Sequence, residues 1–285
     1  MTIKTILVPV RGDGKGAKVL DYALAAARRF NAHIDVVHTR PRPEDLIPFA
    51  TLSMGGAVKR QITESANRAA EIEESRLKKL FEKYVKAKKV PITDKPDGKK
   101  VTAAWREATG KQSTNVALYG RLADLIVVPQ PDELAGTNTL EAALMETGKL
   151  VLMAPAKPVK ATLFAHVAFG WDGGTEAAKA VTGALPILEA ARRVTVFSAP
   201  VSTEPRLPVE TVVEYLRRHG IKAAVKTLNV KASGVGDALL GGAAKAGADV
   251  LLMGAFGQSR GRELVMGSVT RHIIDTAKMP VVLMH

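Results

Sequence analysis

The sequence repeats itself, because its two halves follow the same order of apolar segments and glycine-rich turns. The first half opens with an apolar segment at 6–10, a glycine-rich turn and a helical pattern over 16–30. The second half repeats this order with an apolar segment at 167–169 and a helical pattern over 175–191. Self-similarity at this period indicates a duplicated structural unit, which constrains the fold more than any single motif does.

The closing segments of the two halves also match. Residues 123–128 and 248–253 both begin with Ala-Asp and continue in apolar residues, and each half ends on a further apolar segment, at 150–153 and 281–284. Short continuous apolar segments between helical patterns are typical of parallel strands buried on both faces. The sequence therefore predicts an α/β fold of two tandem doubly wound domains, each a five-stranded parallel sheet with flanking helices.

The boundary between the two domains is predicted from local composition. The second half contains expected strands near 163–169, 194–198, 223–228, 250–253 and 281–284. The first half adds a long charged helix at roughly 58–88, and a loop follows it. The segment 155–160 contains two prolines and is interpreted as the linker, so we expect one domain over 1–156 and another over 157–285.

The closing segments 150–153 and 281–284 are candidates for bare sheet edges, which would favour aggregation. If they pair with each other, both edges are hidden and the two domains form a pseudo-dimer within one chain. A homodimer of the whole chain and an unidentified protein partner are left open.

Composition excludes several classes of protein. The chain contains no cysteine, so disulfide frameworks, thiolate metal sites and cysteine nucleophiles are excluded. Its apolar runs are far shorter than the roughly 18 residues that would span a membrane, and its N-terminus lacks the pattern of a secretory signal, so we expect a cytoplasmic protein. The six histidines are scattered without metal-ligand spacing, and neither a Walker A motif nor a Gly-x-Ser-x-Gly elbow occurs.

The net charge of +13 favours partners of negative charge. Much of the excess lies in the first half, for example in the lysines and arginines that recur between 76 and 89 along the predicted long helix. Aromatic residues that would stack on bases are nearly absent there, which argues for a solvated helix face and against a nucleic-acid groove.

The second half carries a candidate ligand site. In a doubly wound sheet, ligands bind beyond the carboxyl ends of the strands, where the strand order reverses. Asp172 follows the first predicted strand of this half and Gly254 ends the fourth, so both open onto one crevice if these strands are neighbours. Gly254, Gly257, Gly267 and Ser268 form the pattern Gly-x2-Gly-x9-Gly-Ser. Glycines allow the backbone to approach a phosphate, and the helix that Ser268 opens would offer unpaired N–H groups to it.

This pattern resembles that of the nucleotide-binding universal stress proteins, which carry it after the fourth strand together with an Asp after the first. The resemblance covers the second half well and the first half in outline. It implies a stress-response sensor or signalling protein that binds ATP with Mg²⁺ on its phosphates, and at most a slow ATPase or self-phosphorylating activity with no catalytic residue assigned. The resemblance implies a nucleotide site formed by Asp172, Gly254, Gly257, Gly267 and Ser268, with further contacts from Gly170, Ala199 and Val269.

Each of these residues also has a structural explanation. Gly257 and Gly267 fit ordinary turns, Ser268 fits a helix cap, and Asp172 fits a cap for the helix near 175. Trp171 is either a cover for the adenine ring or a packing residue, and His272 is expected on the surface of its helix. The nucleotide interpretation depends on the joint spacing.

The first half departs from the pattern, and we expect its nucleotide site to be degenerate. Arg11 stands where Asp172 does, and Pro-Gln-Pro-Asp at 129–132 replaces the second half's first two glycines. The two prolines remove backbone donors that a phosphate would need. A regulatory or scaffolding role is therefore expected for this half.

Two alternatives remain. The turn Gly12-x-Gly14-x-x-Ala17 formally matches a dinucleotide fingerprint, and Arg40 would suit a 2′-phosphate, but no catalytic set accompanies them and we disfavour an NADP-dependent enzyme. The second alternative is a nucleotide-independent binding module that uses its basic first half to meet an acidic partner.

Overall fold

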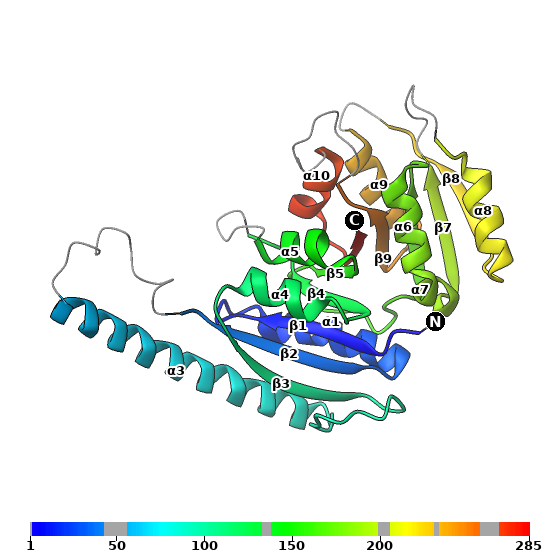
Figure 1. The fold of residues 1–285 in the computed structure, drawn as a ribbon. Coiled ribbons are helices and arrows are strands. Elements are labelled where there is room, and N and C mark those ends of the chain that lie inside the picture. Colours follow the sequence, from blue (N-terminus) through cyan, green and yellow to red (C-terminus); the bar gives the residue numbers. More distant parts are fainter. Residues whose placement is uncertain (1, 43–55, 133–137, 199–205, 231–233, 257–267) are drawn as a thin grey trace.

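The computed structural model describes residues 2–42, 56–132, 138–198, 206–230, 234–256 and 268–285 (Figure 1). The elements of the first half are β1 (Thr5–Val10), α1 (Gly16–Phe30), β2 (His33–Arg40), α3 (Gly56–Ala87), β3 (Thr102–Thr109), α4 (Gln112–Gly120), β4 (Leu125–Pro129), α5 (Asn138–Thr147) and β5 (Leu150–Ala154). The elements of the second half are β6 (His166–Trp171), α6 (Thr175–Gly183), α7 (Leu185–Ala190), β7 (Arg193–Ser198), α8 (Val209–Arg218), β8 (Ala223–Thr227), α9 (Gly234–Lys245), β9 (Val250–Gly254), α10 (Ser268–Thr276) and β10 (Val281–Met284).

The strands form one ten-stranded sheet in the order β3-β2-β1-β4-β5-β10-β9-β6-β7-β8. Neighbours are parallel within each half, and the one antiparallel pair described is β5 with β10. The predicted doubly wound α/β pattern is therefore confirmed, with the two expected five-stranded sheets joined into one.

The junction between the halves is the expected pairing of the closing strands. In it, Leu152 lies opposite Val282, and both side chains are buried. Each of these strands is covered on one side by its own half and on the other by its partner, so neither presents a bare edge. The edges of the sheet are instead β3 and β8, which both carry exposed side chains.

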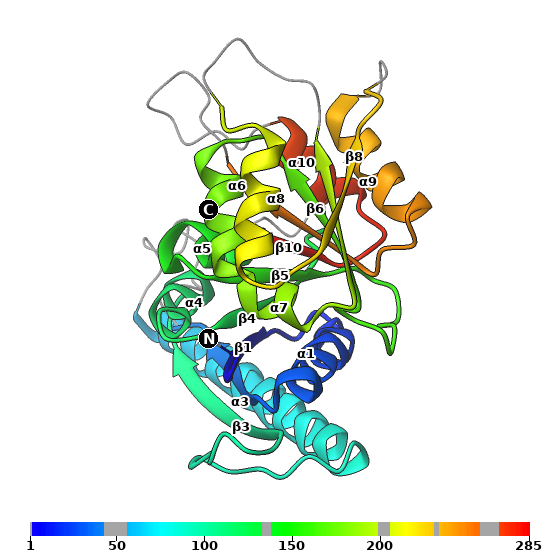
Figure 2. The ribbon, with the colours of Figure 1, turned by 90° about the vertical axis from the view of Figure 1, so that its right-hand side faces the viewer.

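Two layers of helices cover the sheet (Figure 2). A hydrophobic core lies under each layer, and both cores run through the two halves. Residues of α1, α3, α6, α7 and α8 belong to one core, and residues of α4, α5, α9 and α10 belong to the other. Side chains alternate between the two along the inner strands, as in β1, where Ile6 and Val8 enter the first core and Leu7 enters the second. This explains why the strands read as continuous apolar runs.

A repeated aspartate fixes the amino ends of both halves. Asp124 Oδ2 accepts hydrogen bonds from the backbone N–H groups of Lys4 and Thr5, at 2.7 and 2.9 Å. Asp249 Oδ2 accepts from those of Ala165 and His166, both at 3.1 Å. The Ala-Asp pairs that mark the sequence repeat are therefore structural devices that hold β4 to β1 and β9 to β6.

One predicted helix is divided. The sequence pattern predicts a single helix over 175–191, whereas the structure has α6 and α7 with Ala184 between them. Pro186 lies in the first turn of α7, where its missing N–H costs nothing, and it cannot continue the hydrogen bonding of α6. The long helix α3 matches its predicted range to within two residues at each end.

Candidate functional site

The carboxyl ends of β6 and β9 lie side by side in the second half. The two strands are parallel neighbours, with Gly170 in register with Met253. The chain moves from β6 outward to β7 and β8, whereas β9 and β10 lie on its other side, so the strand order reverses between β6 and β9. This is the switch point at which the sequence analysis expected a ligand site, with Asp172 just after β6 and Gly254 at the end of β9.

Asp172 has two protein partners at this switch point. Its Oδ1 accepts a hydrogen bond from the backbone N–H of Gly174 at 2.9 Å, and its Oδ2 lies 2.5 Å from Arg206 Nη1. Gly173 between them has φ +76° and lies against the backbone of Leu207, which leaves no room for a side chain. The Asp172 side chain nevertheless remains 53% exposed, so the carboxylate can also meet a ligand.

The glycines at the strand ends serve close packing. A Cβ on Gly254 would lie 2.5 Å from the carbonyl carbon of Glu176, because the first turn of α6 rests on the end of β9. A Cβ on Gly170 would lie 2.8 Å from Leu239 Cδ2 of α9. The sequence analysis assigned these two glycines to the nucleotide site, and the structure shows that both also allow close packing of helices on the strand ends.

The helix α10 begins at Ser268, whose side chain is exposed. The first N–H groups of a helix have no partner within it and carry the positive end of its dipole, so this end is suited to an anion. Val269 is half-buried beside it, and the buried Thr270 Oγ1 accepts a hydrogen bond from the backbone N–H of Phe256 at 3.4 Å. This bond holds the start of α10 close to the end of β9.

Three predicted site residues, Gly257, Gly267 and Ala199, lie outside the residues that the structure describes. Asp172, Gly254, Gly170, Ser268 and Val269 are described, and they lie at the carboxyl ends of β6 and β9 and at the start of α10.

Two neighbouring residues have structural partners. Trp171 is buried, donates a hydrogen bond from Nε1 to the Leu207 carbonyl oxygen at 3.2 Å and packs against Phe169. This favours packing over an adenine cover. His272 Nε2 lies 2.8 Å from Asp237 Oδ1 of α9, so it joins two helices at the surface.

The corresponding end of the first half is arranged differently. Arg11 follows β1 and donates hydrogen bonds to Gln112 Oε1 and, at 2.7 Å, to Thr139 Oγ1. Lys15 Nζ lies 2.7 Å from Asp132 Oδ2 and donates to the carbonyl oxygen of Gln130 at 3.0 Å. The sequence predicted that this end would differ, and the structure fills it with its own ion pair.

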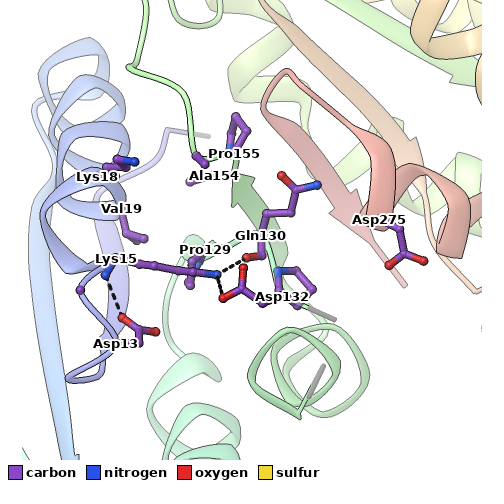
Figure 3. Close-up of a pocket in the computed structure, with 13 residues that line it drawn as sticks. Asp13, Lys15, Lys18, Val19, Pro129, Gln130, Asp132, Ala154, Pro155 and Asp275 are labelled. Carbon is purple, nitrogen blue, oxygen red and sulfur yellow. Dashed lines mark hydrogen bonds and ion pairs between the residues drawn. The ribbon is translucent and has the colours of Figure 1, made fainter. Parts of the chain in front are cut away.

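A pocket of about 620 Å³ lies beside this ion pair, between the start of α1, the loop after β4 and the chain after β5 (Figure 3). Asp275 of α10 lies on the other side of it, so residues of both halves line the pocket. Gln130 Nε2 also donates a hydrogen bond to the carbonyl oxygen of Ile274 at 2.7 Å. The degenerate loop of the first half therefore touches the last turn of the helix that opens at Ser268.

Sequence reasoning missed Arg206 as a site residue. It belongs to no recognised motif and precedes α8 by three residues, far in sequence from Asp172. No pattern of spacing indicates this contact, because it depends on how the segment before α8 folds back over the turn after β6.

Within the described ranges, no cluster of three or more His, Asp or Glu side chains is arranged to hold a metal ion. A membrane-spanning helix is also absent from that part of the chain, where none combines the necessary length with an apolar composition.

The fold and this site define a class, namely doubly wound α/β proteins of two repeated units with a candidate ligand site at the point where the strand order reverses. The model of the universal stress protein family matches residues 2–118 and 164–285. The chain therefore belongs to the universal stress protein family, with one match in each half.

Comparison with solved structures gives the same fold. A universal stress protein from Archaeoglobus fulgidus DSM 4304 aligns over 98% of this chain and 97% of its own, at 15% identity and a TM-score of 0.68. A functionally unknown protein from Pseudomonas aeruginosa PAO1 aligns over 99% of this chain and 92% of its own, at 16% identity and a TM-score of 0.54. No curated protein sequence matches the chain.

Proposed function

We propose that this protein has a stress-response role in which its second half binds ATP, with Mg²⁺ on the phosphates. The observation that carries the proposal is the meeting of three features at the carboxyl ends of two neighbouring inner strands. The acid Asp172 and the end of β9 lie on neighbouring strands at the switch point, and α10 begins beside them at Ser268. The glycine spacing between Gly254 and Ser268 joins the last two features.

The described residues fit a nucleotide with magnesium. Ser268 and the N–H groups of the first turn of α10 would bind phosphate oxygens, and the half-exposed Asp172 would accept hydrogen bonds from the nucleoside. Arg206 lies beside Asp172 and would offset negative charge. Mg²⁺ commonly keeps several waters and is held largely by phosphates, so a cage of protein carboxylates is not required. When bound, it would neutralise phosphate charge.

The proposed role is that of a sensor. A ligand that binds only the folded state stabilises that state by linkage. Nucleotide occupancy would therefore order the site and change the surface that a partner protein contacts. No residue is assigned a catalytic role, and slow hydrolysis or self-phosphorylation is left open. The remaining proposed contacts to the nucleotide come from Gly257, Gly267, Ala199, Gly170 and Val269.

Thermal unfolding with and without Mg-ATP tests the proposal. At free ATP about 100 times its Kd, linkage adds about 2.7 kcal/mol, which raises the midpoint by several degrees. A Gly257→Asp, Gly267→Asp double variant places two carboxylates where the phosphates would approach, and its midpoint should not respond. The matched control is Gly16→Asp, Gly56→Asp in the first half, where a Cβ meets open space at both positions and neither backbone has a positive φ.

The outcomes separate two functions. A rise in the parent and the control, absent from the Gly257, Gly267 variant, supports ATP binding in the second half. No rise in the parent at saturating ATP moves the assignment to a nucleotide-independent module whose basic first half meets an acidic partner. In that case, binding to such a partner should weaken steeply with salt.

A further inference from the structure

A second, chemically different pocket lies in the first half, away from the proposed nucleotide site. It has a volume of about 390 Å³, is open to solvent on one side and is lined by α1, by the C-terminal part of α3 and by β1, β2 and β3. Its lining is mostly aliphatic and aromatic, and its charged members are Arg11, Arg76 and Lys83. No aspartate or glutamate is among the residues that line it.

The long helix α3 supplies two parallel rows of side chains to this pocket. Leu77, Phe81 and Tyr84 form the inner row, and Arg76, Leu80 and Lys83 form the outer row. The members of each row are four and three residues apart, so each row follows one face of the helix. Leu77 and Phe81 are buried, whereas Leu80 is 51% exposed and marks the mouth.

The floor of the pocket is aromatic. Phe81 packs against Trp105 of β3 with ring centroids 5.5 Å apart, and Trp105 stacks on His38 at 5.9 Å. The Tyr84 hydroxyl donates a hydrogen bond to Asp21 Oδ1 at 2.8 Å, so its polar atom already has a partner and its ring is left for apolar contact. An apolar cavity of this size, with a few polar groups at its margin, is typical of small-molecule sites.

The three basic side chains of this pocket differ in their protein partners. Arg76 pairs with Glu73 at 2.6 Å, and Arg11 is held by Gln112 and Thr139. Over the described ranges, Lys83 has no ion pair, so its ammonium group is available to an anion. Arg11 also reverses the charge found at Asp172, the corresponding strand end of the second half. The basic residues that line this apolar pocket therefore disfavour a positively charged ligand.

We propose that this pocket binds an amphiphilic carboxylate of the fatty-acid class, with its apolar chain over Phe81 and Trp105 and its carboxylate at Lys83 and Arg76. Removal of the chain from water supplies most of the affinity. The cations select the negatively charged head group over a neutral or positive one of equal length. A nucleotide fits poorly, because its several phosphate charges would need more donors than this apolar lining offers.

Trp105 provides a direct readout, because the chain contains only two tryptophans. A Trp171→Phe variant leaves Trp105 as the single fluorophore. It is titrated with decanoate, decanol and decyltrimethylammonium below their micelle concentrations. We expect a saturable change in Trp105 emission with decanoate, a Kd at least about tenfold weaker with decanol, and none with the cation. Equal binding of the three, or no response to decanoate, overturns the proposal.

Two pairs of variants locate the binding. Ala17 lines the pocket and is exposed, so Ala17→Phe should fill the mouth and abolish binding, whereas Ala69→Phe, at an exposed position of α3 away from the pocket, should not. The Arg76→Gln, Lys83→Gln double variant should weaken decanoate about tenfold and leave decanol unchanged. Lys79→Gln, on the same helix outside the pocket, should change neither.

Calorimetric titration of the unaltered protein with the same three ligands repeats the test if Trp171→Phe fails to fold. Retention of full decanoate affinity in Ala17→Phe would place the binding elsewhere and overturn the assignment. Decanoate binding does not depend on the nucleotide proposal, since the two sites share no residue.

Discussion

Arg206 Nη1 lies 2.5 Å from Asp172 Oδ2, so the acid at the end of β6 is held by a cation from the segment before α8. The same carboxylate accepts a hydrogen bond from Gly174 through its other oxygen. The two contacts fix its orientation at the switch point of the sheet while leaving about half of its side-chain surface exposed. A preorganised acceptor costs less entropy when a ligand binds than a freely rotating one does.

Asp172→Asn tests the acid itself. The amide keeps an oxygen for the N–H of Gly174 but loses the charge that faces Arg206 and the nucleotide. We expect the Kd for Mg-ATP to rise about tenfold, which corresponds to about 1.4 kcal/mol. Asp13→Asn is the matched control, because Asp13 accepts a hydrogen bond from the N–H of Lys15 in the corresponding turn of the first half. An unchanged Kd in Asp172→Asn would remove this residue from the site.

Gly254→Ala tests the contact between α6 and β9. The added Cβ would meet the backbone of Glu176 at 2.5 Å, and backbone cannot move aside cheaply. We expect a loss of about 1–3 kcal/mol in the free energy of unfolding. Gly241→Ala in α9 meets open space and should stabilise the protein by about 0.5–1 kcal/mol. Urea unfolding of both variants measures these changes, and equal stability of the two would contradict the packing explanation.

Gln130→Ala tests the link between the two halves. The variant leaves the carbonyl oxygen of Ile274 without its donor, and we expect a loss of about 1 kcal/mol. Gln61→Ala, at an exposed position of α3, should change the free energy of unfolding by less than about 0.5 kcal/mol. If both variants behave alike, the bond contributes nothing measurable to the junction.

His166 should make stability depend on pH. Burial, followed by the positive charge of Arg193, lowers the pKa of its imidazole below the ordinary value of 6.5. The native state therefore binds fewer protons than the unfolded state just below pH 6.5, and stability falls as the pH falls through that value. Urea unfolding between about pH 7 and pH 5 should show a shallower dependence in His166→Gln. A slope identical to that of the parent would show that His166 does not titrate differently on folding.

Local sequence pattern predicted most of the fold. The helix over Gly16–Phe30 and the strand over Val281–Met284 match their expected ranges, because apolar period and turn residues act over a few neighbours. The Ala-Asp repeat at Asp124 and Asp249 indicated the duplication, since each half needs the same anchor for its first strand. The break between α6 and α7 was missed, although Pro186 was visible in the sequence.

The sequence by itself determined the tandem α/β plan, the family pattern from Gly254 to Ser268 and the loss of that pattern in the first half. Tertiary structure decided what spacing along the chain cannot encode. It paired Leu152 with Val282 to join the sheets, brought Arg206 to Asp172, and formed a pocket between α1 and α3. These contacts join residues far apart in sequence, and they form only when the helices pack on both faces of the sheet and bury its apolar side chains.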